Sequence, residues 1–577
     1  MEKSNIEHIR HSFAHLLAAA VKKLHPKVQF GIGPVIENGF YYDFGNIKMT
    51  SADLPNIEKE MRTIASQNLP FKKELWPASK ATAHFKKEKQ PFKIELIKDL
   101  SVKKVGMVYM GDIFLDLCRG GHIKNTKELP LDSFQLTSVA GAYWRGDEKR
   151  PMLTRIYGAA FASKKELEQH LCALQEAEKR DHKKLGQQLD LFSFHEEAPG
   201  FVFWHPKGML LRQALMGLHN ELHKKAGYLE VSTPILLSED LWKRSGHWDH
   251  YKDKMYFTKI DSRIFAIKPM NCPGAILIYK NRPRSYKELP FRLAEAGEVH
   301  RHEPSGTLNG LLRVRAFRQD DTHIFVRPDQ VQEEVTGVIR LTLEFYRIIG
   351  FKDVHVELST RPQRYIGSIT MWQKAERTLK TILAGLKIDY KINKGEGAFY
   401  GPKIDFHIKD SLGRFWQLGT IQLDFAMPER FDITYVDKDG KHKRPVIIHR
   451  TVIGSIQRFM GILIEHFGGA FPLWLAPEQV WMVPVSDKFV QHAEKVGGKL
   501  KEQLPSLRLK IQDENETLGK KIREGELQKI PYLLIVGERE QHMGTVSVRK
   551  RGKGDLGQMK PEEFLQNVEK ELEHKTN

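Results

Sequence analysis

Residues 298–325 carry several side chains that could act together on a substrate, EVHRHEPSGTLNGLLRVRAFRQDDTHIF. The stretch predicts two strands joined by a loop rich in Pro, Ser, Gly and Asn. In the second strand, alternation places one set of side chains on a single face: Arg313, Arg315, Phe317, Gln319, Asp321 and His323. Cations for phosphates, a ring for a base and polar groups to orient a second substrate indicate a nucleotide site. The plainer interpretation is a solvated basic hairpin that touches RNA.

Two more charged residues, Arg301 and Glu303, share a face of the predicted first strand. Arg301-x-Glu303 followed by Arg313-x-x-x-Phe317 resembles motif 2 of the class II aminoacyl-tRNA synthetases, and RHEPSG…GLLRVR.F.QDDTHIF is similar to the threonyl family among them. The resemblance implies that Arg301 binds the α-phosphate of ATP and that Arg313 reaches the γ-phosphate. It also implies that Glu303 reads the adenine amino group while Phe317 stacks on adenine. Gln319 and Asp321 are further catalytic candidates on the same strand.

Bulk composition limits the class of protein. A length of 577 residues predicts three or four domains, each with its own core. A net charge of +19, spread along the chain, favours a polyanionic partner. Three widely spaced cysteines argue against a disulfide framework. The start lacks a signal-peptide run, and charges interrupt the apolar stretch 452–475, so we expect a soluble cytoplasmic protein with no membrane segment.

A second group of reactive side chains lies near the N-terminus. His11 and His15 project from one face of a predicted helix over 4–24. Cys118 and His122 follow Asp116 in a glycine-rich turn, DLCRGGH. Two histidines at i,i+4 with Cys-x₃-His form a ligand set for tetrahedral zinc. The alternative is a pair of helix-surface histidines and a buried free thiol.

This N-terminal region also resembles a known domain. HSFAH, PFK with Lys93, DLCRGGH and AYWRGD match the editing domain of bacterial-type threonyl enzymes. The resemblance implies that His11, His15, Cys118 and His122 hydrolyse mischarged tRNA without a metal, with Lys93 and Asp116 orienting the ester and the attacking water. Zinc at this site stays open, because the related alanyl editing domain uses it.

Three other residues are joined only by the resemblance, since nothing in their spacing connects them. Cys272 lies in KPMNCPG, His323 ends the motif 2 strand and His449 lies in PVIIHRTVIGSIQRF. The resemblance implies that they hold one catalytic zinc per subunit, with positions left open for substrate. Ala275 follows MNCPG where the family usually has His, a residue that is not a ligand.

Further motifs of the catalytic region flank these. Four leucines form one stripe of a predicted helix that Gly227 ends: Leu211, Leu215, Leu218 and Leu222. This helix and the strand YLEVSTP that follows resemble motif 1, which implies a homodimer. An amphipathic helix packed against the core gives the same pattern. GSIQR, with Ser455 and Arg458, resembles motif 3, whose arginine meets the γ-phosphate. Two alternating strand regions carry further residues that resemble active-site positions: Tyr400, Lys403, Gln417, Thr420 and Gln422.

Beyond about residue 477, apolar strand runs alternate with charged helical patterns at 488–503, 517–530 and 561–573. This pattern predicts a compact α/β module of about 100 residues. Asn515, Glu540 and Arg549 match family positions that read anticodon bases. General RNA affinity of a basic domain is the alternative.

Together these motifs predict an α+β multidomain chain: an α+β editing domain (1–162), a linker helix (163–186), a class II synthetase catalytic core on an antiparallel sheet (187–476) and an α/β anticodon-binding domain (477–577). The resemblance implies an enzyme that activates threonine with ATP and Mg²⁺, transfers it to the 3′ end of tRNA(Thr), and hydrolyses mischarged seryl-tRNA(Thr). It also implies that a small domain, usual before the editing domain in bacterial members, is absent here.

Two competing hypotheses remain at this point. A synthetase-like RNA-binding regulator has no use for Arg301, Glu303, Arg313, Phe317 and Arg458 together. A sister enzyme of the same class, such as the prolyl one, is disfavoured by Cys272, His323 and His449, since zinc suits an amino acid that carries both an amine and a hydroxyl.

Overall fold

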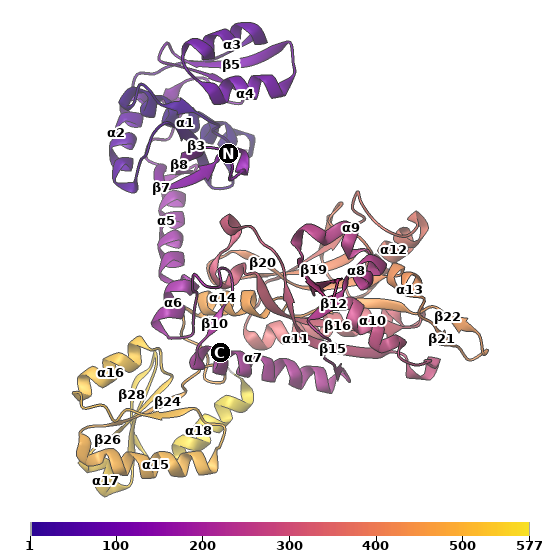
Figure 1. Ribbon diagram of the computed structural model, residues 1–577. Helices are drawn as coiled ribbons and strands as arrows, with labels where there is room; N and C mark the ends of the chain where they lie inside the picture. Colours follow the sequence, from indigo (N-terminus) through magenta and orange to yellow (C-terminus); the bar gives the residue numbers. More distant parts are fainter. Residues whose placement is uncertain (1–2, 576–577) are drawn as a thin grey trace. The chain divides into compact units, whose positions relative to one another are not determined.

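The computed structural model describes residues 3–575, with residues 3–5 described by their backbone only. Its contacts divide the chain into two compact units, residues 1–175 and residues 176–577 (Figure 1). Within the described residues, no helix combines the length and apolar composition that crossing a membrane requires.

In the N-terminal unit, helix α1 (Lys3–Leu24) forms the middle of the core, where Phe13 and Leu17 are fully buried. The helix packs on α2 (Leu54–Ala65) and on an antiparallel sheet of order β1-β3-β8-β7, with β2 beside β3. The strands are Gln29–Phe30 (β1), Val35–Ile36 (β2), Gly39–Gly45 (β3), Phe134–Tyr143 (β7) and Met152–Ala160 (β8). The predicted helix over 4–24 is confirmed.

A smaller antiparallel sheet, β4-β5-β6, completes this unit. Its strands are Phe71–Pro77, Lys104–Met110 and Phe114–Leu117, and α3 (Ala78–Lys87) and α4 (Pro91–Leu100) pack with it around Phe85 and Met107. The DLCRGGH turn begins in β6, so the glycine-rich segment leaves this sheet toward α1.

The linker region differs from the single helix expected over 163–186. It forms two helices, α5 (Lys164–Lys179) and α6 (His182–Gln188). Asp181 separates them, because its carboxylate accepts the backbone N–H groups of Lys183 and Lys184 and so caps the start of α6.

The larger unit is built on an eight-stranded sheet of order β11-β15-β16-β23-β20-β19-β17-β18. The five pairings from β15 to β17 are antiparallel, and the two outermost are parallel. The strands are Leu229–Glu230 (β11), Phe291–His300 (β15), Ala316–Val326 (β16), Val354–Ser359 (β17), Tyr390–Asn393 (β18), Lys403–Lys409 (β19), Phe415–Asp424 (β20) and Val446–Thr451 (β23). This is the antiparallel core expected from the sequence.

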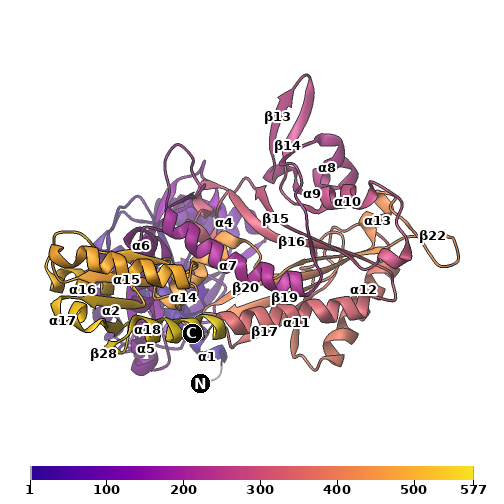
Figure 2. The same cartoon turned by 90° about the horizontal axis from the view of Figure 1, so that it is seen from below.

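Long helices pack on this sheet and bury its apolar residues. They are α7 (Pro206–Lys225), α11 (Val331–Ile349), α12 (Ile369–Gly385) and α14 (Ile456–Phe467). The α11 helix contacts β20, β23 and α12, and Figure 2 shows α11 and α12 along one side of the sheet. The predicted leucine stripe of α7 is confirmed, since Leu211, Leu215, Leu218 and Leu222 are all buried in this core.

A small sheet and four short helices complete this region of the larger unit. A three-stranded sheet, β12-β14-β13, consists of Leu236–Ser238, Arg263–Ile267 and Tyr256–Ile260. Beside it lie the short helices α8 (Glu239–Ser245), α9 (His247–Tyr251), α10 (Cys272–Lys280) and α13 (Ala426–Arg430).

The C-terminal module has the alternating pattern that the sequence predicts. Its mixed sheet has the order β25-β24-β26-β27-β28, with strands Val480–Pro484 (β24), Leu509–Ile511 (β25), Tyr532–Val536 (β26), Val546–Lys550 (β27) and Gly554–Met559 (β28). The helices are Val490–Gln503 (α15), Leu518–Leu527 (α16), Glu538–Met543 (α17) and Pro561–His574 (α18). Three of them, α15, α16 and α18, fall on the predicted helical segments.

Candidate functional site

A cleft of about 670 Å³ opens beside the eight-stranded sheet. It gathers all but one of the candidate catalytic and zinc residues of the core: Cys272, Arg301, Glu303, Arg313, Phe317, Gln319, Asp321, His323, Tyr400, Gln417, Thr420, Gln422, His449, Ser455 and Arg458. The exception is Lys403, whose Nζ lies 2.9 Å from Asp405 Oδ2. Four of these side chains alternate along β16, from Phe317 to His323, as the period of two predicts.

The strand assignment of the flanking arginines was wrong. Ladder pairing between β15 and β16 ends at His300 and Ala316, so Arg301, Glu303, Arg313 and Arg315 lie in the connecting loop. Pro304 and two short 3₁₀ turns occupy that loop. Arg315 is held by carbonyl oxygens of Glu303 and Pro199 and does not line the cleft.

The loop nevertheless gathers its charges at the cleft. Arg301 lies over the ring of Phe317, 5.0 Å from the ring centroid, and donates a hydrogen bond to the Pro269 carbonyl. Arg313 pairs with Glu303, with 2.9 Å between Nη2 and Oε2. A cation and an aromatic ring thus lie side by side, an arrangement that accommodates both a phosphate and a flat base.

The turn after β23 brings Arg458 to the same cleft. Fully buried Asp320 accepts the backbone N–H groups of Val452, Ile453 and Gly454 at 2.7–3.0 Å. Ser455 then caps α14 by accepting the N–H of Arg458 at 3.3 Å. Gly454 has φ +75°, and a Cβ there would lie 2.8 Å from the Leu418 carbonyl oxygen, so this tight turn requires glycine.

The Arg458 guanidinium is poorly satisfied within the described residues. Burial lowers its pKa, and the nearby Arg313 charge lowers it further. Its Nε is buried without a hydrogen-bond partner in the described part of the chain. Two neighbouring cations, one of them desolvated, form an environment that an anion would stabilise.

Cys272, His323 and His449 meet at the base of the cleft. Their ligand atoms lie within 4.8 Å of one another, and all three side chains are buried. His323 Nε2 lacks a hydrogen-bond partner among the described residues. Burial raises the pKa of Cys272 and lowers that of His323, so without a cation both groups are neutral. A thiol and two imidazoles, one with an unpaired nitrogen, fit a divalent ion such as Zn²⁺.

A buried carboxylate supports this trio from behind. Asp424 Oδ2 lies 2.9 Å from His449 Nε2, and its other oxygen accepts the N–H groups of Ala426 and Met427. Such carboxylate–histidine pairs orient metal-binding imidazoles. His247, fully buried and 3.6 Å from Cys272 Sγ, is a further neighbour that the sequence analysis missed.

Between the phosphate side and the trio, polar side chains line the cleft. Asn271 donates to Asp321, and burial raises the pKa of Asp321 to about 6 against the lowering effect of the His449 charge. Tyr400 hydrogen-bonds Gln422. These groups could orient a small polar substrate.

Asp405 organises the neighbouring part of the site and was also missed. Its carboxylate accepts hydrogen bonds from Gln417 (2.7 Å), Thr420 (3.2 Å) and Lys403 (3.2 Å). The side chain is 3% exposed. An acid on the inward face of the strand KIDFHIK was the available signal, because a buried carboxylate requires partners.

In the N-terminal unit, His11, His15, Cys118 and His122 form a second cluster. Their ligand atoms also lie within 4.8 Å of one another. Cys118 Sγ lies 3.4 Å from His11 Nε2 and 3.3 Å from His122 Nε2. Burial lowers the pKa of all three imidazoles and raises that of the Cys118 thiol. The imidazoles are therefore neutral, and their nitrogen lone pairs are available to bind a cation or to accept a hydrogen bond.

The remaining N-terminal candidates, Lys93 and Asp116, form a buried ion pair. Lys93 Nζ lies 2.6 Å from Asp116 Oδ1, and the two side chains are 3% and 5% exposed. Tyr42, which the sequence analysis missed, donates to Asp116 Oδ2 at 2.5 Å and accepts from Lys93 at 3.0 Å. Burial, reinforced by the Asp116 charge, raises the pKa of Tyr42.

The three anticodon candidates lie in different settings. Asn515 is exposed in the loop before α16. Glu540 accepts hydrogen bonds from the Gly537 N–H, Ser547 and Gln558 within its own module. Arg549 lies on β27, 3.9 Å from Glu526.

Comparison with protein families agrees with this arrangement. Residues 256–467 match the tRNA synthetase class II core domain (G, H, P, S and T), and residues 479–571 match an anticodon binding domain. Residues 105–157 match the threonyl and alanyl tRNA synthetase second additional domain. The chain therefore contains the core of a class II aminoacyl-tRNA synthetase.

Individual relatives narrow the class. The chain is 54% identical to the threonine–tRNA ligase of Carboxydothermus hydrogenoformans, over 98% of this chain and 89% of that protein. It is 53% identical to the threonine–tRNA ligase of Desulforamulus reducens, over the same shares. A crystal structure titled the RNA binding domain of threonyl-tRNA synthetase from Cryptosporidium parvum is similar with a TM-score of 0.65 and 40% identity, covering 68% of this chain and 98% of that one. The chain belongs to the threonine–tRNA ligase family.

The buried Lys93–Asp116 pair generates a stability prediction. Asp116→Asn leaves the Lys93 charge buried without its counter-ion, so we expect the N-terminal unit to lose about 3–5 kcal/mol. Calorimetric unfolding of the full chain measures this loss. Asp99→Asn removes the carboxylate of a more exposed pair with Arg145 and should cost no more than about 1 kcal/mol. Equal losses in the two variants would contradict the prediction.

Proposed function

We propose that the cleft activates threonine with ATP and Mg²⁺ and transfers it to the 3′ end of tRNA(Thr), and that the N-terminal cluster hydrolyses seryl-tRNA(Thr). The observation that carries the proposal is the meeting of Arg301, Arg313 and Arg458 with the Phe317 ring and a Cys-His-His trio in one cleft. A protein that only binds RNA gains nothing from that combination.

Positioning and charge stabilisation perform the activation step. Arg301 and Arg458 neutralise phosphate oxygens while negative charge develops on the departing pyrophosphate. Phe317 and Glu303 hold the adenine, and Arg313 contacts the γ-phosphate. Arg301 is held by its hydrogen bond to the Pro269 carbonyl, and the turn that leads to Arg458 is held by Asp320, so the backbone that carries these two cations is positioned before the reaction begins.

Cys272, His323 and His449 would hold one Zn²⁺ per subunit, and the bound ion would supply a Lewis acid that selects an amino acid with both an amine and a hydroxyl. Asp424 would keep His449 oriented. The amino acid would be oriented by polar side chains of the cleft: Gln319, Asp321, Tyr400, Gln417, Thr420 and Gln422. Lys403 would act through its ion pair with Asp405.

Threonine and serine are hard to separate in a single site. A site that pairs the hydroxyl rejects valine by roughly 10⁴-fold, because valine leaves that polar group unpaired. Serine lacks only a methyl group, which yields about 1–3 kcal/mol or some 10–200-fold. A second, hydrolytic site is therefore required, and we assign it to His11, His15, Cys118 and His122, with Lys93 and Asp116 orienting the ester and water.

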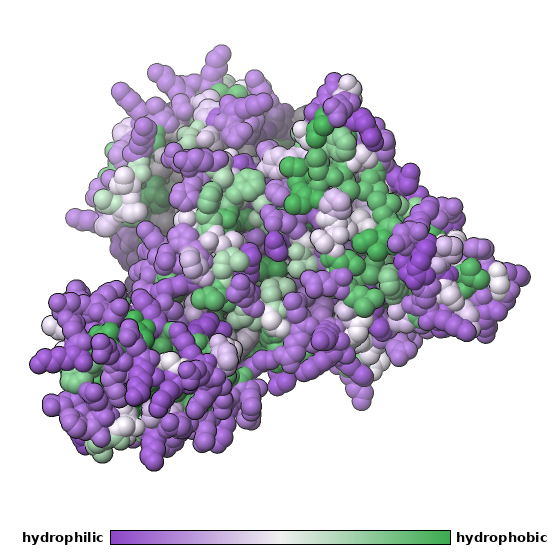
Figure 3. Space-filling model, turned by 60° about the horizontal axis from the view of Figure 1, so that its bottom comes forward, coloured by the Kyte–Doolittle hydropathy of each residue, from purple (hydrophilic) through white to green (hydrophobic). Residues whose placement is uncertain are grey.

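Partners and domain limits complete the proposal. Figure 3 shows a broad apolar area on the face drawn, with smaller apolar areas elsewhere on that face. The segment 229–264 exposes large apolar side chains, which support a homodimer formed through motif 1: Leu229, Ile235, Leu236, Phe257, Ile260 and Ile264. We further propose the domain limits 1–162, 163–186, 187–476 and 477–577, with Asn515, Glu540 and Arg549 at the anticodon. The cytoplasmic location stays a prediction.

Activation depends on Arg301. Arg301→Ala removes a cation from the developing charge, so threonine-dependent ATP–pyrophosphate exchange should fall about a hundredfold or more. Arg318→Ala is the matched control, because Arg318 is the exposed neighbour of Phe317 on the opposite face of β16 and contacts only Glu298 among acidic groups of the described chain. Near-normal exchange in the Arg301 variant would contradict the assignment of this cleft as the ATP-binding site.

Zinc content tests the buried trio. The purified chain should hold about one zinc per subunit, and Cys272→Ser should lose it. Cys172→Ser changes an exposed cysteine and should retain the metal. If Cys272→Ser kept full occupancy on metal analysis, the ion would lie elsewhere, with the His11, His15, Cys118 and His122 cluster as the next site to test.

Editing is tested by a double variant. His15→Ala with Cys118→Ala should leave threonyl-tRNA synthesis nearly unchanged but let seryl-tRNA accumulate, because the proposed hydrolytic site loses two of the four side chains that form it. The matched control is His25→Ala with Cys172→Ala, which removes an exposed histidine and an exposed cysteine. Clearance of added seryl-tRNA at the wild-type rate would refute the assignment, and loss of threonylation as well would make these residues structural.

A further inference from the structure

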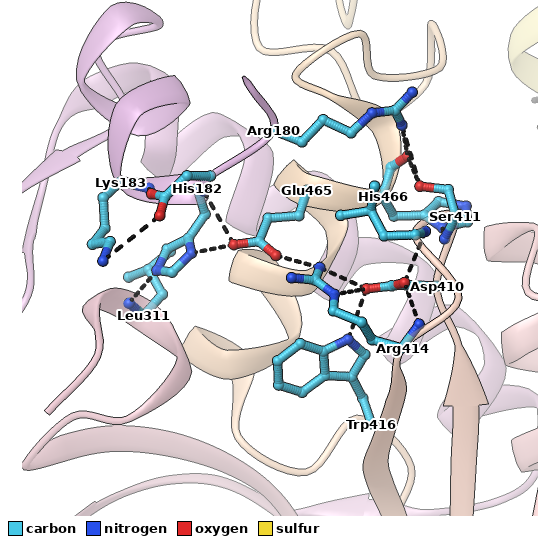
Figure 4. A network of polar contacts seen from close by, with 12 residues as sticks. Arg180, His182, Lys183, Leu311, Asp410, Ser411, Arg414, Trp416, Glu465 and His466 are labelled. Atoms are coloured by element: carbon cyan, nitrogen blue, oxygen red, sulfur yellow. Dashed lines mark hydrogen bonds and ion pairs between the residues drawn. The ribbon is translucent and has the colours of Figure 1, made fainter. Parts of the chain in front are cut away.

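A buried polar network connects the α5–α6 linker with the cleft (Figure 4). Its first member, His182, is the first residue of α6 and is 1% exposed. One side of its imidazole meets Glu465 on α14, with 2.6 Å between Nδ1 and Oε1. The other side meets the 3₁₀ turn Gly310–Leu312, whose Leu311 N–H donates to Nε2 at 3.0 Å.

These two contacts fix the tautomer of His182. Nε2 accepts a backbone N–H and therefore carries no proton, so Nδ1 carries one and donates it to Glu465. The Glu465 carboxylate also accepts the His182 backbone N–H at 3.2 Å. Burial opposes ionisation of Glu465, but hydrogen bonds from His182 and Arg414 outweigh it and lower the pKa.

From Glu465 the network continues toward Arg458. Arg414 bridges Glu465 and the buried Asp410, whose Oδ2 also accepts the Trp416 indole N–H at 2.8 Å. The Arg458 guanidinium lies over the Trp416 ring, 5.5 Å from its centroid. Arg458 and Glu465 stand on the same helix, so Glu465 fixes α14 while Trp416 supports the guanidinium.

On the other side, the network reaches Arg313. The turn that His182 holds ends at Leu312, directly before Arg313. Gly310 has φ +48°, and a Cβ there would lie 2.2 Å from His182 Nε2. The turn therefore approaches the imidazole as closely as only glycine allows, and Leu311 is fully buried beside it.

We propose that His182 is a positioning residue for both phosphate-binding arginines: its imidazole holds the turn before Arg313 and, through Glu465, the helix that carries Arg458. The proposal rests on the proposed function, because it requires ATP in the cleft. The turn before Arg313 and the helix that carries Arg458 both position phosphate-binding side chains. Weakening either contact of His182 should therefore weaken ATP binding, while the threonine contacts beside Cys272, His323 and His449 stay in place.

Two conservative variants separate the halves of the contact. In His182→Asn the amide nitrogen takes the place of Nδ1, which retains the donor to Glu465 and loses the acceptor for Leu311. In His182→Gln the amide oxygen reaches the place of Nε2, which retains that acceptor and loses the donor. Glu465→Gln removes the charge at the centre of the network. The control, Glu334→Gln, removes another buried carboxylate of the same unit, one that pairs with Arg292 away from the cleft.

ATP–pyrophosphate exchange on the full chain gives separate KM values when ATP or threonine is varied while the other is saturating. We expect His182→Gln and Glu465→Gln, which remove or weaken a hydrogen bond to a charged group, to raise the KM for ATP about tenfold. His182→Asn loses only the neutral hydrogen bond from Leu311 and should raise it about fivefold. The KM for threonine should change less than about twofold. The control should leave both values unchanged, although its Tm can fall.

An unchanged KM for ATP in all three variants, or an equal rise in Glu334→Gln, would overturn the positioning role and reduce His182 to a packing residue. If the wild-type chain showed exchange and Arg301→Ala lost it, the proposed function would stand after that failure. Absence of threonine-dependent exchange in the wild type would overturn both proposals.

Discussion

The hydrogen bonds that Asp320 accepts from residues 452–454 hold the two halves of the active cleft together. Asp320 lies on β16, the strand that presents Phe317 and Asp321, whereas the three N–H groups belong to the turn that leads into α14. A fully buried carboxylate would be costly if it were unpaired, so the turn cannot move away without exposing that cost. Together with the pairing of β16 and β23, this carboxylate fixes the position of the motif 3 helix relative to the motif 2 strand.

The other candidate sites of the described chain contain similar buried carboxylates. Asp405 gathers Lys403, Gln417 and Thr420, Asp424 orients His449, and Asp116 pairs with Lys93. In each case a buried carboxylate fixes a side chain of a candidate site, because its oxygens require hydrogen-bond donors. The buried carboxylates thus restrict the motion of the neighbouring side chains that form the candidate sites.

The sequence predicted the residues that face the cleft better than those behind it. Alternation along β16 correctly grouped Phe317, Gln319, Asp321 and His323, because strand period is a local property. It wrongly extended the strand to Arg313 and Arg315, since pairing stops at Ala316 where the loop with Pro304 intervenes. His182 and Glu465 are 283 residues apart, and no periodicity connects them. Such partners emerge only from the packing of whole elements, which neither spacing nor composition encodes.

The cations of the cleft have a consequence for the free protein. Arg313 and Arg458 lie close enough for the charge of one to disfavour that of the other, and Arg458 is also desolvated. A polyphosphate that pairs with these side chains would favour the cationic form of Arg458, so nucleotide binding and folding would be thermodynamically linked. The nucleotide concentration around the protein would then help to set the fraction of chains whose catalytic region is folded.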